Sequence, residues 1–321
     1  MAKDSAPSAT PYKVLALKYR PQTFSDIIGQ DHIKTALSAA IDKNKVAHAF
    51  MFAGSRGTGK TTSARILAKA LNCLSNDGPT KEPCGTCAAC KEIADSRDMD
   101  VLEIDGASNN GVEQIRELRS VIDNRPVRDR YRIIIIDEVH MLSIAAFNAL
   151  LKTLEEPPPH VKFIFATTDP HKVPETIHSR CQHYDFRRLS SEQIVESLAK
   201  IATNEGVSAE DGVYATIGRI SEGGMRDAQS KLDQLIAFRG SSIKLQDVEE
   251  VFGLIGRKRL LELASAFRAK DTGFALNVVD EVFTQGKDLS NFVAGLIGLM
   301  RDLLILHACG GESKVLDLMA D

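Results

Sequence analysis

One eight-residue stretch constrains the fold of this chain more than any other. It reads Gly-Ser-Arg-Gly-Thr-Gly-Lys-Thr over residues 54–61, which fits the pattern G-x-x-x-x-G-K-[ST]. An apolar run over 49–53 precedes it, and a helical pattern over 64–71 follows. In this context the backbone N–H groups of the turn and the helix N-terminus face phosphate oxygens. The stretch therefore predicts a nucleoside triphosphate site, and the alternative is a chance glycine-rich turn.

The positions of this phosphate-binding loop have separate expected roles. Lys60 is expected to neutralise the β- and γ-phosphates, and Thr61 to place its hydroxyl on Mg²⁺. The other expected nucleotide contacts are Gly54, Ser55, Arg56, Gly57, Thr58, Gly59 and Thr62. The upstream segment would wrap the adenine, and its contacts would be Tyr19, Arg20, Pro21 and Ile27. Ordinary packing of that segment is the alternative.

Two carboxylates follow an all-apolar run at 133–136. Such a run is typical of a central parallel strand that is buried on both faces. Ligands bind at the carboxyl edge of open α/β sheets, which is where Asp137 and Glu138 would lie. Asp137 is the expected Mg²⁺ partner and Glu138 is placed to polarise the attacking water. Two solvated acids at a strand end are the alternative. A further buried strand is expected at 162–166 and ends in Thr167, Thr168 and Asp169, where a polar residue can sense the γ-phosphate.

Four cysteines lie within 18 positions of one another, at Cys73, Cys84, Cys87 and Cys90. The C-x₂-C-x₂-C spacing directs three thiolates to one point, and Cys73 can complete a tetrahedron. Disulfides and an iron–sulfur cluster are the rivals. We interpret the group as a zinc site. Because protein ligands fill all four positions, the zinc would be structural rather than catalytic.

The order of elements predicts the domain organisation of the 321 residues. Residues 1–11 are expected to be a disordered leader without a signal peptide. Residues 12–188 alternate strands and helices, which predicts a doubly wound α/β fold with a parallel five-stranded sheet. Residues 189–242 and 243–321 have helical patterns, and Ser190 and Gln193 are expected to form a capping box at the start of the first of these helices. The apolar runs are shorter than a membrane span, and the net charge of −3 restricts any nucleic-acid contact to a local patch.

Several stretches, taken in order, resemble one known family. They are Leu-Lys-Tyr-Arg-Pro at 17–21, the phosphate-binding loop, the cysteines, Asp-Gly-Ala-Ser-Asn-Asn-Gly-Val at 105–112, Ile-Asp-Glu-Val-His-Met-Leu at 136–142, Phe-Asn-Ala-Leu-Leu-Lys-Thr-Leu-Glu-Glu-Pro-Pro at 147–158 and Ser-Arg-Cys at 179–181. Together they resemble the gamma/tau subunits of the bacterial DNA polymerase III clamp loader, which are AAA+ ATPases. The resemblance covers roughly residues 12 to 310.

The resemblance implies roles for three further residues and for each domain. Thr168 would be the first sensor of the γ-phosphate, Arg226 a second sensor on a helical lid, and Arg180 a group that reaches the nucleotide of the neighbouring subunit. The zinc module would cover 73–90, the lid 189–242 and a helical collar 243–321. The family's collar is longer, so we expect the collar here to be truncated.

The family also implies cofactors, partners and a location. ATP, Mg²⁺ and Zn²⁺ are the expected cofactors. The expected partners are copies of this chain and delta- and delta-prime-type subunits in a five-subunit ring, together with the sliding clamp and primer–template DNA, and no membrane. We expect the helices that open after 108–111 and at Ser143 to contact DNA phosphates. A cytoplasmic protein, associated with the nucleoid at replication forks, is expected.

The predicted function is that of an ATP-hydrolysing clamp-loader motor in chromosomal replication. One alternative is a structural subunit of the same ring that hydrolyses no ATP. The other is a different AAA+ DNA-remodelling motor, such as a branch-migration motor. The complete pairs Lys60–Thr61 and Asp137–Glu138 argue against the silent subunit. The cysteine cluster argues against the branch-migration motor.

Overall fold

A computed structural model describes residues 12–284 and 286–309 of the chain. These residues belong to two compact units. The sheet unit comprises the chain up to Gln193 together with Gly223–Asp227, and the helical unit comprises Ile194–Glu222 and the chain from Ala228 onward. The leader expected at 1–11 and the last twelve residues of the expected collar lie outside the described residues.

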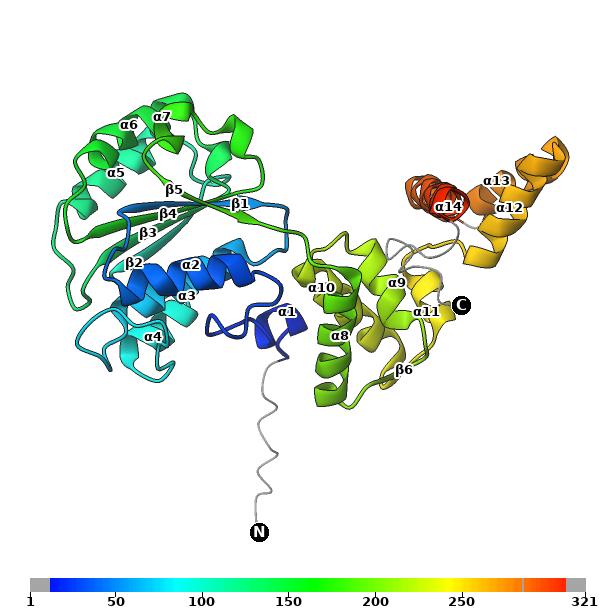
Figure 1. Cartoon of the computed structure of the whole chain (residues 1–321), viewed down its shortest axis with the longest axis horizontal. Coiled ribbons are helices and arrows are strands. Elements are labelled where there is room, and N and C mark those ends of the chain that lie inside the picture. Colours follow the sequence, from blue (N-terminus) through cyan, green and yellow to red (C-terminus); the bar gives the residue numbers. More distant parts are fainter. Residues whose placement is uncertain (1–11, 285, 310–321) are drawn as a thin grey trace, which may run out of the picture. The chain divides into compact units, whose positions relative to one another are not determined.

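The sheet unit is built on a parallel five-stranded sheet, which confirms the predicted fold class (Figure 1). Its strands are β1 (Ala49–Gly54), β2 (Val101–Asp105), β3 (Arg132–Asp137), β4 (Val161–Thr167) and β5 (Gln182–Phe186), in the spatial order β2-β3-β4-β1-β5. The central strands β1, β3 and β4 are almost wholly buried, as all-apolar runs in parallel sheets require. The strand order brings the carboxyl ends of β1, β4 and β3 side by side.

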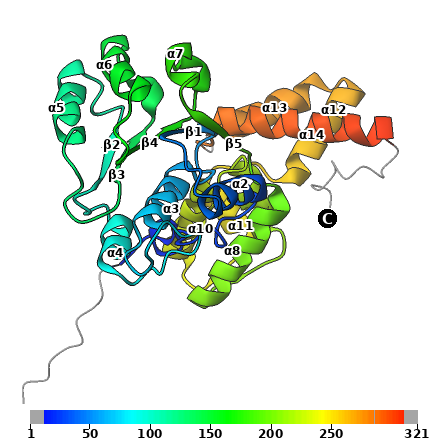
Figure 2. The ribbon, with the colours of Figure 1, turned by 60° about the vertical axis from the view of Figure 1, so that its left-hand side comes forward.

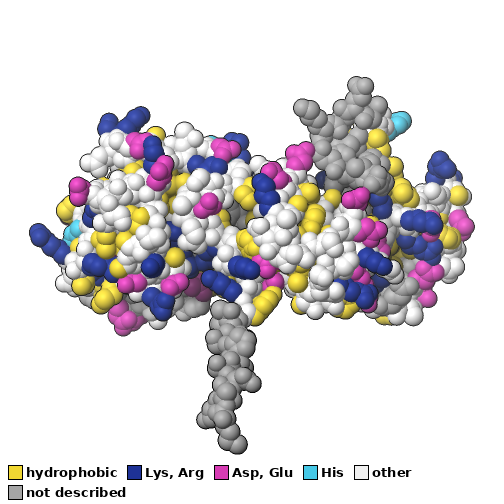
Figure 3. All heavy atoms as spheres, turned by 90° about the horizontal axis from the view of Figure 1, so that it is seen from below, with side chains coloured by type: hydrophobic (Ala, Val, Ile, Leu, Met, Phe, Trp, Pro, Cys, Tyr) yellow, Lys and Arg dark blue, Asp and Glu magenta, His cyan; other side chains and the backbone are white. Residues whose placement is uncertain are grey.

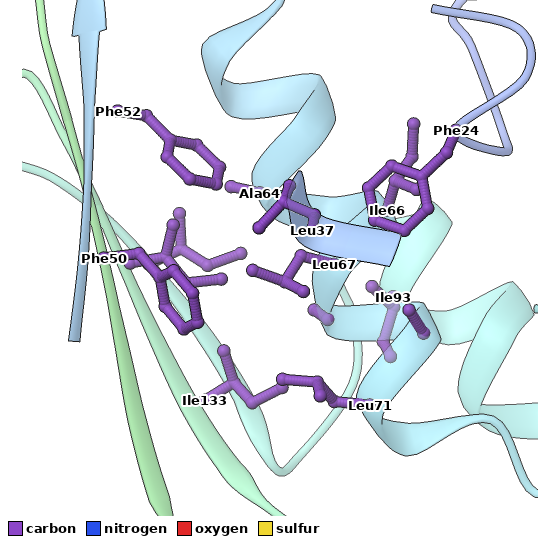
Figure 4. Close-up of a cluster of buried hydrophobic side chains, with 14 of the residues drawn as sticks. Phe24, Leu37, Phe50, Phe52, Ala64, Ile66, Leu67, Leu71, Ile93 and Ile133 are labelled. Carbon is purple, nitrogen blue, oxygen red and sulfur yellow. The ribbon is translucent and has the colours of Figure 1, made fainter. Parts of the chain in front are cut away.

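Helices cover both faces of this sheet (Figures 1 and 2). On one face lie α2 (Asp31–Asp42), α3 (Lys60–Asn72) and α4 (Ala88–Ala94), and on the other lie α5 (Val112–Ile122), α6 (Ile144–Glu155) and α7 (Glu175–His178). Alternate strand residues serve the two faces: Phe50 packs with α3, whereas Met51 packs with α6. Figure 4 shows the first of these cores, with Phe50, Leu67 and Ile133 directed toward one another.

Three short elements join these layers. The first is α1 (Leu15–Lys18), which the sequence did not predict. The 3₁₀ helices η1 (Val139–Met141) and η2 (Pro170–Lys172) follow β3 and β4. They carry the chain away from the strand ends where Asp137 and Thr167 lie.

The opposite edge of the sheet holds a buried acidic group, which consists of Asp98, Asp100 and Asp129. Arg128 pairs with Asp98 and with Asp129, and Arg132 pairs with Asp100. These contacts fix the loops that precede β2 and β3. The group is a structural ion-pair network at the amino ends of β2 and β3, whereas the phosphate-binding loop follows the carboxyl end of β1.

The helical unit consists of short amphipathic helices. They are α8 (Ser191–Glu205), α9 (Val213–Ile220), α10 (Met225–Arg239), α11 (Leu245–Val251), α12 (Arg257–Ala269), α13 (Thr272–Thr284) and α14 (Leu289–Cys309), of which α8 and α10 begin in the sheet unit. Ser190 and Gln193 form the predicted capping box of α8, and Gly206 follows its end with φ 68°. A two-stranded parallel pairing of β6 (Ser208–Ala209) with β7 (Ser242–Ile243) was not predicted.

Helix α14 contradicts the expectation that the apolar runs are all shorter than a membrane span. Residues Leu289–Ala308 are long and apolar enough to cross a membrane, with a mean hydropathy of 1.6. This is weak evidence by length and composition alone, since a helix that packs against other helices passes the same test. Phe292 and Leu299 of α14 pack in a small core with α12 and α13, while Ile297 and Leu304 are exposed.

Charges of both signs are interspersed on the surface. On the face seen in Figure 3, lysine and arginine side chains alternate with aspartate and glutamate. This distribution agrees with the small net charge of −3. A nucleic-acid contact would therefore depend on local geometry rather than on a broad cationic field.

Candidate active site

The phosphate-binding loop has the geometry that its glycines predict. Gly54 ends β1 with φ 148°, and a Cβ there would lie 2.4 Å from the backbone oxygen of Phe186. Gly57 and Gly59 have φ of 77° and 99°, which favour glycine. Helix α3 begins at Lys60 directly after the loop, so its free N–H groups end at the loop.

Lys60 is buried at the base of this loop. Its ammonium donates to the backbone oxygens of Gly54 at 2.8 Å and Ser55 at 2.9 Å. Burial lowers the pKa of Lys60, and the nearby Glu138 and Asp137 oppose that shift. The ammonium therefore lies among backbone oxygens of the loop, close enough to Glu138 and Asp137 for their charges to attract it.

Thr61 and Asp137 come together as the sequence predicts. The Thr61 hydroxyl donates to Asp137 Oδ2 at 2.7 Å, although the two residues are 76 positions apart. A hydroxyl and a carboxylate are hard oxygen donors of the kind that Mg²⁺ prefers. Their placement beside the phosphate-binding loop fits a shared Mg²⁺.

Glu138 lies one residue beyond the strand, in a left-handed backbone conformation with φ 46°. Such a conformation is uncommon outside glycine. Its Oε2 accepts from the Thr168 hydroxyl at 2.9 Å and from the Thr168 N–H at 3.2 Å. The expected sensor thus contacts the expected water-polarising carboxylate.

Residues 223–227 lie against the phosphate-binding loop within the sheet unit. A Cβ on Gly57 would be 3.0 Å from the Cα of Gly224. Arg226 lies near Arg20: the pKa of Arg20 is lowered by burial, then by repulsion from Arg65 and from Arg226, with Glu103 and Asp137 opposing. The expected second sensor therefore lies close enough to Arg20 for the two positive charges to repel each other.

The residues expected to contact the adenine differ in their burial. Ile27 is buried in the apolar core with Phe24, which is the ordinary packing role for that residue. Tyr19 and Pro21 are half-buried. Lys69, whose side chain is buried, donates to the backbone oxygen of Gln22 at 2.6 Å and holds this segment on α3. Sequence reasoning gave Lys69 no role, and its place in a helical pattern carried no signal of burial.

Arg180 lies between α7 and β5. Its guanidinium donates to the Thr176 backbone oxygen at 2.7 Å and to Glu155 Oε1 at 2.7 Å. The side chain is about one-third exposed (32%). Its hydrogen bonds therefore run to α6 and α7 of its own sheet unit, as those of a surface arginine in a salt bridge would. This geometry leaves a role at a neighbouring subunit untested.

The four cysteines converge as predicted. Their sulfur atoms all lie within 4.8 Å of one another, with Cys73 and Cys90 buried. Backbone N–H groups point at the sulfurs: Cys87 donates to Cys84 Sγ at 3.2 Å, and Cys84 donates to Cys73 Sγ at 3.4 Å. The Ser75 hydroxyl, with donors from Thr86 and Cys87, lowers the pKa of Cys84 to about 5. A four-thiolate donor set with N–H···S bonds fits a structural Zn²⁺.

The two loops expected near DNA also meet. The Ser143 N–H donates to the Asn110 backbone oxygen at 3.1 Å. Ser143 caps α6, accepting from the Ala146 N–H at 3.2 Å, and α5 begins at Val112. The N-termini of α5 and α6 thus lie next to each other. Whether they contact DNA stays a prediction.

Together, the phosphate-binding loop, the strand-end acids and the polar residue after β4 define a P-loop nucleotide-binding protein of the AAA+ class. The chain resembles a solved structure of the Thermotoga maritima RuvB Holliday junction branch migration motor, with TM-score 0.54 and 19% identity over 87% of this chain and 91% of that one. At this identity the likeness concerns the fold alone.

Sequence comparison places the chain within that class. The family described as DNA polymerase III, delta subunit, matches residues 29–190. The clamp loader subunit ATPase lid domain matches 193–241, and domain III of the DNA polymerase III subunits gamma and tau matches 243–321. The chain belongs to the family of DNA polymerase III gamma and tau subunits.

Three relatives illustrate the match. DNA polymerase III subunit tau of Bacillus subtilis is 46% identical over 306 residues, which are 95% of this chain and 54% of that protein. The tau subunit of Escherichia coli is 40% identical over 96% of this chain and 48% of that protein. The gamma subunit of Buchnera aphidicola is 42% identical over 86% of this chain and 76% of that protein. The chain spans about half the length of the two tau relatives.

Proposed function

We propose that the chain is an ATP-binding and ATP-hydrolysing motor subunit of the DNA polymerase III clamp loader, which drives opening of the sliding clamp and its loading onto primed DNA. One observation carries this proposal: Lys60, the Thr61–Asp137 pair and the Thr168–Glu138 pair gather at the carboxyl ends of three neighbouring strands. That is the set of parts that phosphoryl transfer to water requires.

Each part has a distinct proposed role. Lys60 neutralises the β- and γ-phosphates, and the loop at 54–59 with Thr62 contacts the remaining oxygens. Thr61 and Asp137 hold Mg²⁺, whose positive charge offsets the charge that develops on the phosphates. Glu138 accepts a hydrogen bond from the attacking water, and Thr168 reports the γ-phosphate to Glu138. Tyr19, Arg20 and Pro21 form the adenine side, supported by the Lys69 contact with Gln22, while Ile27 packs in the core behind them.

Two arginines complete the proposed site. Arg226 faces the γ-phosphate from the segment that lies against Gly57. Arg180 acts on the nucleotide of the neighbouring subunit, for which it exchanges its Glu155 partner for phosphate oxygens. The partial exposure of Arg180 supports a role in trans, as does its place just before β5, whose Gln182 pairs with Phe50 at the end of β1 away from the phosphate-binding loop.

The proposed assembly follows from the family. Copies of this chain and delta- and delta-prime-type subunits form a five-subunit ring through the helical collar, and primer–template DNA contacts the N-termini of α5 and α6. Zn²⁺ on Cys73, Cys84, Cys87 and Cys90 stabilises the loop at 73–90 without taking part in hydrolysis. The protein acts in the cytoplasm at replication forks.

The test uses the chain assembled with its partner subunits, clamp and primed DNA. Glu138→Gln is expected to retain Mg·ATP affinity and to lose turnover by about 10²- to 10⁴-fold, because it removes the group that polarises water. Asp137→Asn is expected to weaken Mg²⁺-dependent nucleotide binding as well. Glu196→Gln, which alters an exposed lid carboxylate paired with Lys200, is the matched control.

The outcomes separate the competing functions. An assembled wild-type ring in which this chain's sites show no turnover would indicate a silent structural subunit. Equal affinity and equal turnover in both acidic-site variants would show that the site is assigned wrongly. Nucleotide turnover that drives branch migration without any clamp loading would support the other class of AAA+ motor.

A further inference from the structure

His140 faces the carboxylate that the proposed mechanism depends on. Its Nδ1 lies 3.4 Å from Glu138 Oε2 and 3.0 Å from Thr167 Oγ1. The His140 side chain is 10% exposed, and Thr167 is fully buried. His140 belongs to η1, so it links the turn after β3 with the end of β4.

The neighbouring groups indicate which nitrogen of the His140 imidazole carries a proton. Thr167 Oγ1 already accepts the Asp169 N–H at 3.0 Å and retains a second lone pair. A bare lone pair at Nδ1 would be repelled by the Glu138 carboxylate, whereas an N–H at that position is attracted. We therefore assign a proton to His140 Nδ1, directed between Thr167 Oγ1 and Glu138 Oε2.

With this assignment, three donors approach one oxygen of Glu138. They are the Thr168 hydroxyl, the Thr168 N–H and the more distant His140 Nδ1. Within the described part of the chain, no hydrogen bond is made to Glu138 Oε1. One carboxylate oxygen is thus anchored to the protein, and the other remains available to accept a hydrogen bond from water.

We propose that His140 is a positioning residue for Glu138, a role that rests on the proposed ATPase function. Glu138 has a left-handed backbone with φ 46°, so its side chain leaves the strand at an unusual angle and needs support on that side. His140 supplies this support and also fixes Thr167, the neighbour of the sensor Thr168. It affects the reaction through Glu138 and does not contact the nucleotide.

The test measures turnover and Mg·ATP affinity separately, in the ring assembled with partner subunits, clamp and primed DNA. His140→Ala is expected to reduce kcat on the order of 10- to 100-fold, the scale of a small misplacement of a catalytic group. Its Mg·ATP affinity is expected to stay within about twofold of wild type, since Lys60, Thr61 and Asp137 are unchanged. His140→Asn is expected to restore part of kcat, because its amide places a donor near the Nδ1 position.

Two comparisons separate positioning from a general structural effect. His171→Ala is the matched control, since His171 is an exposed histidine of η2 at the same edge of the sheet. In the Glu138→Gln background, single-turnover assays with excess protein are expected to show no further loss from His140→Ala.

Several results would overturn the proposal. The first is a wild-type kcat in His140→Ala while Glu138→Gln is impaired. The second is no recovery of kcat in His140→Asn, provided that this variant melts at the wild-type temperature. The third is a full further loss of turnover when His140→Ala is added to Glu138→Gln. Wild-type turnover in Glu138→Gln would instead reject the proposed mechanism, and the His140 role with it. The two failures are therefore distinguishable.

Discussion

The sheet unit and the apolar bundle α12–α14 differ in how completely they bury their apolar side chains. In the sheet unit, β3 and β4 are buried on both faces and helices cover the whole sheet. In α13 and α14, one stripe is buried at Val278, Val282, Phe292 and Leu299, while a second is exposed at Leu276, Phe283, Ile297 and Leu304. Exposed contiguous apolar surface marks an interaction site.

The difference indicates that the two regions have different roles, nucleotide binding in the sheet unit and assembly in the bundle. The sheet unit itself supplies the residues proposed to bind the nucleotide, from its strand ends, the phosphate-binding loop and α3. The bundle leaves apolar surface uncovered, as expected of a segment that is stable in an assembly. Turnover would then depend on contacts between chains, which the proposed role of Arg180 supplies.

The largest expected effect comes from the residue proposed to act between chains. A guanidinium that stabilises the γ-phosphate charge is worth about 10³- to 10⁵-fold in rate in related phosphoryl transfers. In the assembled ring, Arg180→Ala should lose turnover on this scale and keep the Mg·ATP affinity of its own loop. Mixing Arg180→Ala chains with Lys60→Ala chains should restore part of the turnover at interfaces that pair an intact arginine with an intact loop. Wild-type turnover by a ring of Arg180→Ala chains would end this assignment.

The exposed stripe of α14 provides the next test. Ile297 is 64% exposed, and Ile297→Glu would place a charge within the surface proposed to be covered by neighbouring subunits. We expect assembly, measured by analytical ultracentrifugation, to weaken by at least about tenfold, since a desolvated unpaired charge costs more than 1.4 kcal/mol. Ser290→Glu adds the same charge at an exposed position of the same helix and should assemble normally. Normal assembly by Ile297→Glu would show that this stripe is not an interface.

Removal of the metal should affect a smaller region. Structural Zn²⁺ in small peptides supplies roughly 10–16 kcal/mol of binding free energy, but the large sheet core here does not depend on the cysteine loop. Cys84→Ser should therefore lose zinc and raise amide exchange at 73–90, while nucleotide binding persists. Metal analysis by mass spectrometry measures the first effect. Freshly purified protein without zinc would reject the metal assignment.

The smallest expected effect concerns the acidic group at the far edge of the sheet. Burial raises the pKa of Asp129 in the folded state, so the folded protein binds the proton of this carboxyl more tightly than the unfolded chain does. The stability of the fold therefore falls as the pH rises above the pKa that Asp129 has in the unfolded chain. Burial would raise the pKa of Asp100, but it is outweighed by hydrogen bonds from the N–H groups of Asp129, Arg128 and Val127 and by the charge of Arg132, so this pKa is lowered. Asp100 therefore stabilises the fold at a pH above its pKa in the unfolded chain, and this stabilisation is lost on acidification.

Substitution of these two aspartates should therefore have opposite results at pH 7. Asp129→Asn should leave the opening free energy of β3 unchanged or slightly raised, whereas Asp100→Asn should lower it by about 1–3 kcal/mol through unpaired N–H donors. Native-state hydrogen exchange of β3 amides reports this quantity without requiring both units to unfold together. Equal destabilisation by both variants would contradict the assigned directions.

Much of the fold was predictable because its signals are local. The runs at 49–53, 133–136 and 162–166 became β1, β3 and β4, and the capping box at Ser190 and Gln193 begins α8 as expected. The pair β6–β7 was missed because two-residue strands show no periodicity. The exposed stripe of α14 was missed because an apolar helix has the same composition whether it is buried or uncovered.

The site was predictable where a motif fixes both residue type and place, as for Thr61 with Asp137. It was not predictable where the contact depends on tertiary structure. The buried Lys69 holds Gln22 across 47 positions, and His140 faces Glu138 only because the chain turns through a left-handed residue. The Arg180–Glu155 pair likewise reflects the packing of α6 against α7.

The central claim is that one chain binds Mg·ATP by itself and needs an assembly to hydrolyse it. The direct test compares Mg·ATP affinity and turnover per site for the same protein, alone and assembled with partner subunits, clamp and primed DNA. We predict similar affinity in both states and turnover at least about 10³-fold higher in the assembly, the lower end of the effect of an arginine supplied in trans. An isolated, monomeric chain that hydrolyses ATP at the assembled rate would contradict the account.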